Sequence, residues 1–181
     1  MKTPPDAVAA LIETREVFRG RQFVIAADKV VLPNGNQAEY GVIRHPGSTA
    51  IVPIMDDGSI LMTLQYRYPV GEYLLEIPAG TMEAGESALE CAKRELEEET
   101  GFAAKEFTEL ASVYICPAYS EEKAHIFLAR GLRPSTARPD EDEIIQVVRY
   151  PLGALMSMVE EGKITDALTM VSLYQARMYL R

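Results

Sequence analysis

The stretch GTMEAGESALECAKRELEEETGF, from Gly80 to Phe102, organises the rest of this chain. It predicts a short glycine-flanked loop followed by one helix with clear start and stop signals. Ser87 and Glu90 have the spacing of a capping box, so we expect the helix to begin at Ala88. Gly101 supplies the left-handed residue that ends a helix, which makes Thr100 the expected last helical residue.

Three glutamates of this helix share one strip of its surface. Glu95, Glu98 and Glu99 stand at i, i+3 and i+4, where like charges repel by about 0.2–0.5 kcal/mol per pair. They also lie near the helix C-terminus, where the dipole disfavours anions. A divalent cation such as Mg²⁺ or Mn²⁺ removes both objections, whereas the alternative is a solvated acidic face. The face expected to pack inward carries Leu89, Ala92 and Leu96.

The same residues resemble the Nudix box, Gly-x5-Glu-x7-Arg-Glu-(apolar)-x-Glu-Glu-x-Gly-(apolar). This sequence meets every fixed position with Gly80, Glu86, Arg94, Glu95, Leu96, Glu98, Glu99, Gly101 and Phe102. The match is far more specific than a lone glycine motif. The chain therefore resembles a Nudix hydrolase, which implies an α/β fold: an α/β/α sandwich with a mixed sheet and the box as loop-helix-loop.

Composition limits the class of protein. The 181 residues suit one domain, or one domain with a small appendage, and 48% hydrophobic with 25% charged residues is globular. No apolar run approaches the ~18 residues of a membrane span, and the first residues lack the apolar core of a secretory signal. The only cysteines, Cys91 and Cys116, form no disulfide framework, so we expect a cytoplasmic protein and a buried Cys91.

The net charge of −9 argues against nucleic acid as a partner, because no basic stripe is present, and no membrane partner is expected. An acidic enzyme that acts on an anionic diphosphate needs metal ions and a few placed arginines to bridge like charges.

The N-terminal residues 1–45 are expected to form a subordinate β region beside a main domain of residues 46–181. Val8 to Val17 favours a tail or a short helix, and strands at 22–32 and 37–45 flank a turn at 33–36 to form a hairpin. So small a piece cannot bury a core alone, so it must lie on the main domain or on a second copy of the chain.

In the main domain, the pattern predicts strands at 50–55, 60–66, 73–77, 107–116, 123–129 and 144–150, then helices at 152–161 and 165–180. The turn at 56–59 is expected to join the first two strands as a hairpin. The last helix has core spacing at Ala167, Leu168, Val171 and Tyr174.

The Nudix resemblance implies roles for the box. Glu95 and Glu99, assisted by Glu98, would hold Mg²⁺, with Mn²⁺ as an alternative, and the carbonyl of Ala79 would be a further ligand. Glu86 and Arg94 are expected to form an ion pair that orients the ligands rather than to contact metal directly.

The general base must come from outside the box, because the box glutamates are committed to metal. In similar ADP-ribose hydrolases, a glutamate of a loop before the final strand takes this role. Glu141 and Glu143 fit that position equally well, and the alternative is a solvated acidic loop.

Substrate class follows from resemblance outside the box. Leu64-Gln-Tyr-Arg67 and Leu75-Glu-Ile-Pro-Ala-Gly80 are similar to signatures of ADP-ribose and nucleotide-sugar diphosphatases, with Arg67 as the diphosphate clamp. Pro117 stands at the distance from Gly101 that marks the ADP-ribose subgroup, and Glu121 matches a ribose-contacting glutamate. Ala118 departs from the glycine of many relatives, which leaves the preferred sugar open.

The resemblance thus implies Mg²⁺-dependent hydrolysis of nucleoside diphosphate-sugars, with ADP-ribose giving AMP and ribose 5-phosphate. GDP-mannose, a dinucleoside polyphosphate or NADH are alternative substrates, and a ligand-sensing module without turnover is an alternative function. The subgroup typically forms homodimers that exchange the N-terminal sheet, which would let Arg44 reach the neighbour's nucleotide.

Overall fold

The computed structural model describes residues 8–138 and 144–181. The chain forms two compact units: Met1–Pro46 with Tyr114–Glu122, and Gly47–Val113 with Lys123–Arg181. The first unit joins the N-terminal region to a later segment, 114–122, that was not expected there. Within the described residues, no helix is long and apolar enough to cross a membrane.

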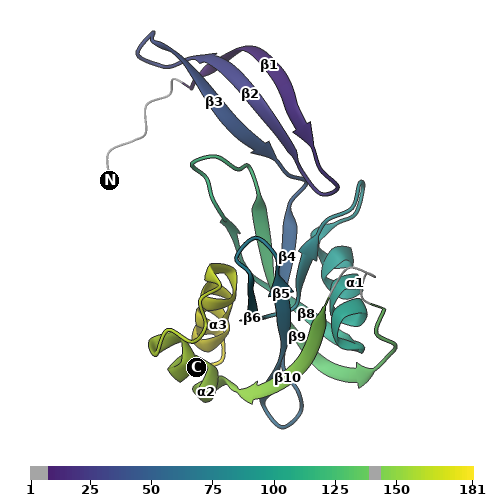
Figure 1. Ribbon diagram of the computed structural model, residues 1–181. Coiled ribbons are helices and arrows are strands. Elements are labelled where there is room, and N and C mark those ends of the chain that lie inside the picture. The colour runs from purple at the N-terminus through teal and green to yellow at the C-terminus, as the bar shows by residue number, and fades with distance from the viewer. Residues whose placement is uncertain (1–7, 139–143) are drawn as a thin grey trace. The chain divides into compact units, whose positions relative to one another are not determined.

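The first unit contains an antiparallel sheet in the order β1-β2-β3 (Figure 1). Its strands are β1 (Ala10–Arg19), β2 (Val24–Val31) and β3 (Gln37–Arg44), so the predicted hairpin is confirmed. The prediction of a tail or short helix at 8–17 is wrong. Residues there pair with β2 from Ala10↔Val31 to Arg19↔Val24, and this cross-strand pairing overrides the local helical pattern.

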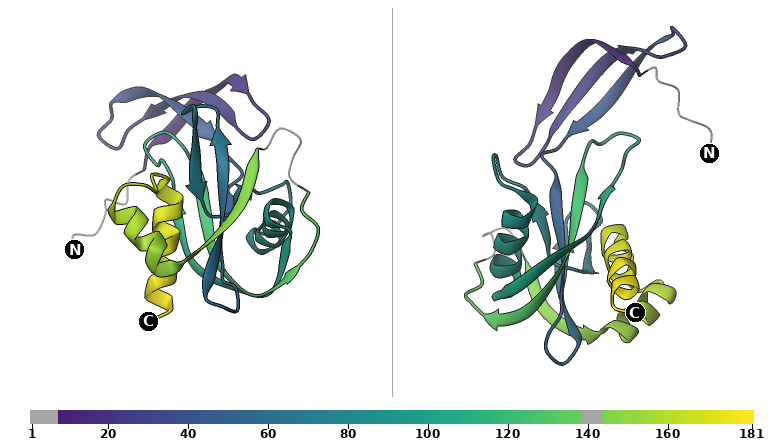
Figure 2. Two further views of the ribbon diagram at one scale, coloured as in Figure 1. Left: turned by 60° about the horizontal axis from the view of Figure 1, so that its bottom comes forward. Right: turned by 180° about the vertical axis from the view of Figure 1, so that it is seen from behind.

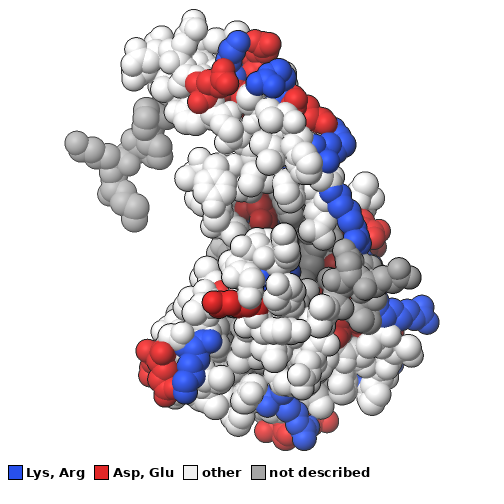
Figure 3. Space-filling model, in the orientation of Figure 1, with Lys and Arg blue, Asp and Glu red and all other residues white. Residues whose placement is uncertain are grey.

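This N-terminal sheet (β1, β2 and β3) has an open face. All ten residues of β1 are exposed, including Leu11, Ile12, Val17 and Phe18. Figure 3 shows acidic and basic side chains interspersed along one edge of the sheet. Lys29 of β2 also pairs with Glu13 of β1, and both side chains are more than half exposed. A mixed surface of this kind is not the basic stripe of a nucleic-acid-binding protein.

The second unit contains two sheets, in the orders β7-β4-β9-β8 and β10-β5-β6. The strands are β4 (Ser48–Pro53), β5 (Ser59–Arg67), β6 (Glu72–Glu76), β7 (Ala79–Thr81), β8 (Phe102–Tyr114), β9 (Lys123–Pro134) and β10 (Ile145–Pro151). β4 pairs with β9 in parallel and with β7 antiparallel, so the predicted mixed sheet is confirmed. β8 and β9 are both longer than predicted.

The predicted hairpin between the strands on either side of residues 56–59 is wrong, although the turn itself forms. The Met55 N–H donates to the Ser59 carbonyl at 2.8 Å, and a single bridge joins Ile54 to Ile60. Beyond that bridge, β5 pairs with β10 and β6. β9 pairs with β4 from Ser48 to Pro53, while β7 and Pro78 take the other edge of β4 as far as Ile51. Little of β4 is therefore left for β5.

Helices cover both sides of the strands of this unit (Figures 1 and 2). The period-2 alternation of β4 and β9 divides their side chains between two cores. Ala50, Val52, Ile126 and Leu128 face the core of α2 (Leu152–Glu160) and α3 (Ala167–Tyr179). Ile51, Phe127 and Ala129 face Ala92 and Leu96 of α1 (Ala88–Thr100). This arrangement is the predicted α/β/α sandwich.

Two predicted core faces are only partly right. Leu89 is 40% exposed, whereas Cys91, Ala92 and Leu96 of α1 are buried. In α3, Leu168 packs against the core as predicted, but Ala167, Val171 and Tyr174 are exposed. The buried residues of α3 are Thr169, Ser172, Leu173 and Ala176. The buried face of α3 includes two hydroxyl side chains, so a count of apolar residues alone placed the face wrongly.

Candidate active site

Helix α1 has the predicted ends. The Ser87 Oγ accepts a hydrogen bond from the Glu90 N–H at 3.3 Å, and the Glu90 carboxylate accepts one from the Ser87 N–H at 2.9 Å. Gly101 has φ of 71°, and its N–H donates to the Glu97 carbonyl at 2.9 Å. The capping box and the left-handed glycine are therefore confirmed, and they fix the phase of the glutamate strip between them.

Arg94 connects the loop of the box to its helix. Its Nε and Nη2 lie 2.9 Å and 3.0 Å from the two carboxylate oxygens of Glu86, so the predicted ion pair is present and bidentate. Nη1 also lies 2.7 Å from Glu95 and 3.1 Å from Glu98. The hydrogen bond from Arg94 holds the pKa of Glu86 below its ordinary value, and the pKa of Arg94 is raised in turn by Glu86. One guanidinium thus balances three carboxylates of the box.

Glu95 and Glu99 meet the backbone of β7. Glu99 is only 4% exposed, and its Oε2 accepts a hydrogen bond from the Ala79 N–H at 3.2 Å. A Cβ placed on Gly80 would come within 1.9 Å of the Glu95 carboxylate. The glycine at the start of the box therefore makes room for Glu95, which explains why this position needs a residue without a side chain.

This set of groups fits a hard divalent cation. Glu95, Glu98, Glu99 and the Ala79 carbonyl offer only oxygen, the donor that Mg²⁺ prefers. Within residues 8–138 and 144–181, no three acidic, histidine or cysteine side chains already converge at metal-ligand distance. Arg94 brings positive charge to this set, since it contacts both Glu95 and Glu98.

Arg67 ends β5 and uses its guanidinium to hold Glu76 at the end of β6. Its Nε donates to the Glu76 Oε1 at 2.9 Å, and its Nη2 pairs with Oε2. The Glu76 side chain is buried, whereas the Arg67 side chain is 42% exposed. The hydrogen bond to Glu76 raises the pKa of Arg67, and Glu99 and Asp166 add to this effect. Glu76 is a functional candidate that the sequence pattern alone did not single out, although it belongs to the Glu-x-Pro-Ala-Gly signature.

Cys91 is buried against the same loop, as predicted. The Thr49 hydroxyl donates to its Sγ at 3.3 Å, and the thiol lies 3.8 Å from the Gly80 carbonyl. Burial raises the pKa of the Cys91 thiol to about 12. The thiol therefore stays neutral near the box carboxylates and serves as packing.

Two predicted substrate-binding residues meet in the first unit. Arg44 pairs with Glu121 at 3.0 Å between Nη1 and Oε2, and it also pairs with the buried Asp28. Hydrogen bonds from Thr14 and then Arg44 lower the pKa of Asp28. Arg44 is therefore held at both ends of its guanidinium, which fixes the Glu121 carboxylate beside it.

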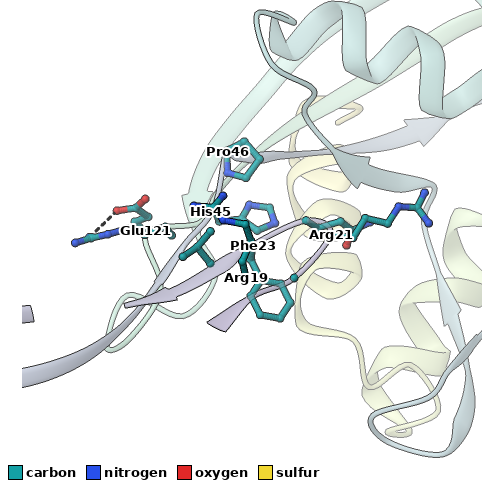
Figure 4. A pocket seen from close by; sticks show the side chains of 10 residues that line it. Arg19, Arg21, Phe23, His45, Pro46 and Glu121 are labelled. Carbon is teal, nitrogen blue, oxygen red and sulfur yellow. Dashed lines mark hydrogen bonds and ion pairs between the residues drawn. The ribbon is translucent and has the colours of Figure 1, made fainter. Parts of the chain in front are cut away.

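A pocket of about 380 Å³ adjoins this pair. Its lining includes Arg19, Arg21, Phe23, Arg44, His45 and Glu121. In Figure 4 the Arg21 side chain points away from Glu121, while Phe23 and His45 lie between them. The pocket thus offers an aromatic face, cations and one carboxylate, which are groups that suit a nucleoside or a sugar phosphate.

The two candidates for the general base, Glu141 and Glu143, lie outside the described residues, so their role stays a prediction.

Comparison with known proteins identifies the family. The model of the NUDIX domain matches residues 44–169. The chain belongs to the NUDIX family. It is 36% identical over 160 residues to an ADP-ribose pyrophosphatase of Bacillus subtilis (strain 168), covering 87% of this chain and 86% of that protein. It is 35% identical over 164 residues to a methanol dehydrogenase activator of Bacillus methanolicus, covering 90% and 89%.

A solved structure titled as an ADP compounds hydrolase superposes with a TM-score of 0.85 at 28% identity, covering 98% of this chain and 97% of that one. The chain is thus an enzyme of the Nudix hydrolase class, as the box predicted. Nudix hydrolases generally use a divalent metal ion such as Mg²⁺.

Proposed function

We propose that this Nudix hydrolase cleaves the diphosphate bond of nucleoside diphosphate-sugars with Mg²⁺, and that ADP-ribose is its substrate, giving AMP and ribose 5-phosphate. The observation that carries the proposal is the position of Glu95 and Glu99 against the Ala79–Gly80 backbone. The similarity to an ADP-ribose pyrophosphatase and to an ADP compounds hydrolase supports the choice of substrate.

Glu95, Glu98, Glu99 and the Ala79 carbonyl would hold the metal. A bound Mg²⁺ would neutralise the diphosphate and favour attack by water. Glu86 keeps the long side chain of Arg94 in place through two hydrogen bonds, and Arg94 in turn orients Glu95 and Glu98. These two residues therefore act on the ligands rather than on the substrate.

Arg67 binds the diphosphate in this proposal. Its Nε and Nη2 face Glu76, and the partly exposed guanidinium carries the charge that a phosphate oxygen needs. Water adds to one phosphorus, the bridging P–O bond breaks, and the water proton passes to a carboxylate. We assign that carboxylate to Glu141 or Glu143, the acidic residues outside the box that the resemblance favours.

Arg44 and Glu121 bind the nucleoside or the terminal ribose. Glu121 offers a carboxylate that accepts from ribose hydroxyls, and its pairing with Arg44 holds that carboxylate in one orientation. Phe23 in the adjoining pocket supplies an aromatic face for a base.

The test is a phosphate-release assay on ADP-ribose, GDP-mannose and other nucleotide-sugars with Mg²⁺, comparing the wild type with Glu99→Gln. A coupling phosphatase, which leaves the diphosphate substrates intact, frees inorganic phosphate from the nucleoside monophosphate and sugar phosphate products. We expect a loss of kcat of about 10²-fold or more in this variant, because it removes a ligand charge. Glu97→Gln is the matched control: Glu97 lies on the same helix but is exposed and outside the metal set, so activity should remain. Equal activity of the two variants would refute the metal role of Glu99.

GDP-mannose is the second candidate substrate, and a preference for it in the same assay would correct the sugar but leave the reaction class intact. A ligand-sensing module without turnover is the other alternative. The complete set of box glutamates disfavours it, and inactivity of the wild type on every diphosphate would favour it.

We also infer that two copies associate through their N-terminal sheets, so that each site uses both chains. The exposed apolar residues of β1 support this, because a surface of this kind is usually covered. Gel filtration with light scattering should give a dimer, and a monomer at micromolar concentration would remove the inference.

A further inference from the structure

We propose that Thr169 is a positioning residue for the reaction. In this role its hydroxyl holds the backbone at Ile77, in a short segment (the junction, residues 76–78) that links the Arg67 clamp to the metal-binding carboxylates. The inference deepens the proposed function and rests on it. It concerns a buried side chain of the C-terminal helix that lies far in sequence from every residue of the box.

The junction consists of three residues: Glu76, which ends β6, and Ile77 and Pro78, which connect it to the start of β7. Here the chain leaves the sheet β10-β5-β6 and enters the sheet β7-β4-β9-β8. All three residues are buried. A buried backbone group outside a strand needs a partner from elsewhere, because an unpaired group loses its hydrogen bonds to water without replacement.

Each residue of the junction is held by a different element. The Thr63 hydroxyl of β5 donates to the Glu76 carbonyl at 3.3 Å. The Ile77 N–H donates to the Thr169 Oγ1 of α3 at 3.1 Å. The Ile51 N–H of β4 donates to the Pro78 carbonyl at 2.8 Å. Of these three contacts, only the one from Thr169 ties the junction to a helix.

The two ends of the junction lead to the two halves of the site. On one side, the Glu76 carboxylate holds Arg67. On the other, Ala79 donates to Glu99, and Gly80 packs on Glu95. A shift of Ile77 would therefore change the spacing between the diphosphate clamp and the metal ligands. Misplacement of reacting groups by about 1 Å can cost 10²-fold in rate.

Thr169 is itself fixed at the start of its helix. The Asp166 carboxylate caps α3 by accepting from the Thr169 N–H at 2.7 Å, and the Thr169 side chain is fully buried. Asp166 is also near enough to Arg67 to favour its charged form. The N-terminus of α3 thus touches the site through one hydroxyl and one charge.

The same helix offers a matched control. Ser172 is one turn further along α3 and fully buried, yet its hydroxyl has no hydrogen-bond partner among the described residues. Loss of this hydroxyl removes no hydrogen bond, whereas loss of the Thr169 hydroxyl removes the hydrogen bond from the Ile77 N–H. An effect that comes only from removing a buried hydroxyl of α3 should therefore appear both in Thr169→Val and in Ser172→Ala.

The experiment compares Thr169→Val, Thr169→Ser and Ser172→Ala by steady-state kinetics on ADP-ribose with Mg²⁺ and by hydrogen exchange of the Ile77 amide. Valine keeps the shape and removes the acceptor, while serine keeps the hydroxyl. We expect Thr169→Val to lower kcat about 10-fold with KM changed less than 3-fold, and to speed Ile77 exchange about 10-fold. Thr169→Ser and Ser172→Ala should stay within 3-fold of the wild type in both measurements.

Two outcomes would overturn the proposal: faster Ile77 exchange in Thr169→Val with kcat unchanged, or Thr169→Ser as impaired as Thr169→Val. If Thr169→Val does not fold, the wild type still decides, because an unprotected Ile77 amide would refute the hydrogen bond. If the wild type hydrolyses no nucleotide-sugar, the proposed function fails instead. The affinity for Mn²⁺ then replaces kcat as the readout. We expect it to weaken about 3-fold or more in Thr169→Val alone, and an unchanged affinity in that variant would overturn the proposal.

Discussion

The box region, residues 79–101, and the N-terminal sheet handle their polar and apolar groups in opposite ways. In the box region Glu99 is buried and the Glu86 side chain is only 13% exposed, and their carboxylates are paired with Arg94 or with backbone N–H groups. In β1 of the N-terminal sheet, apolar side chains such as Leu11 and Phe18 are exposed instead. The buried polar groups of the box region thus find their partners within one unit. The N-terminal sheet instead exposes apolar side chains of the kind that a partner usually covers.

The largest effect should come from Arg94→Met. The change leaves Glu86, Glu95 and Glu98 without the guanidinium that balances them, and breaking a partly buried pair in this way costs about 3 kcal/mol of unfolding free energy. Activity should fall further still, because the ligand carboxylates lose their orientation. Urea denaturation and the phosphate-release assay measure the two losses.

Its counterpart in the sheet is Lys29→Met. Lys29 and Glu13 are both more than half exposed, so this change should cost less than about 1 kcal/mol. A loss in Arg94→Met no greater than that in Lys29→Met would show that the box carboxylates do not depend on Arg94.

Gly80→Ala separates stability from activity. The added Cβ would collide with the end of the Glu95 side chain, which is flexible and can move aside. We therefore expect an unfolding free energy within about 1 kcal/mol of the wild type, but a loss of Mg²⁺-dependent kcat of about 10²-fold. Gly41→Ala in β3 is the matched control, since a Cβ there meets nothing within 4 Å. The prediction fails if both alanine variants keep full activity.

The sequence was sufficient for the local features of the box region. Ser87, Glu90 and Gly101 each act on backbone groups within four residues, so their pattern predicted both ends of α1. The Glu86–Arg94 pair followed from the Nudix resemblance. These features need no knowledge of the rest of the chain.

Features that depend on distant partners could not be predicted. β1 is a strand because β2 pairs with it, and the buried hydroxyl of Thr169 finds its partner in the N–H of Ile77, 92 residues away. The exposed Leu89 shows the same limit within the box helix, since only Ala92 and Leu96 of its predicted face find a sheet to cover. Spacing gives the faces of a helix but does not tell which face meets a neighbour.

The two cysteines test the difference in burial between the box region and the first unit. Cys91 is buried in the box region, while Cys116 belongs to the first unit and is partly exposed. At pH 8 a thiol reagent should label Cys116 at least about 100-fold faster than Cys91. Cys116→Ser should abolish the fast phase, and fast labelling of that variant would contradict the burial of Cys91.

Cys91 also predicts how stability depends on alkaline pH. Its pKa is about 12 in the folded chain against 9.0 for the ordinary thiol, so the unfolded chain loses this proton first. The contribution of the protonated Cys91 thiol to the unfolding free energy is therefore complete below pH 9. The unfolding free energy should fall as pH rises from 9 to 12. Cys91→Ala should show a shallower fall in urea denaturation over this range. An equal slope would mean that other groups govern the alkaline limit.

The smallest expected effect is the coupling between Glu13 and Lys29 in the N-terminal sheet. A double-mutant cycle with Glu13→Gln and Lys29→Met should give about 0.2–1 kcal/mol at low salt, because both side chains face solvent. The coupling should vanish near 1 M salt, where the screening length falls to about 3 Å. A coupling above about 2 kcal/mol that resists salt would mean that the pair is shielded from water. In a dimer, that result would mean that the second copy covers the Glu13–Lys29 pair.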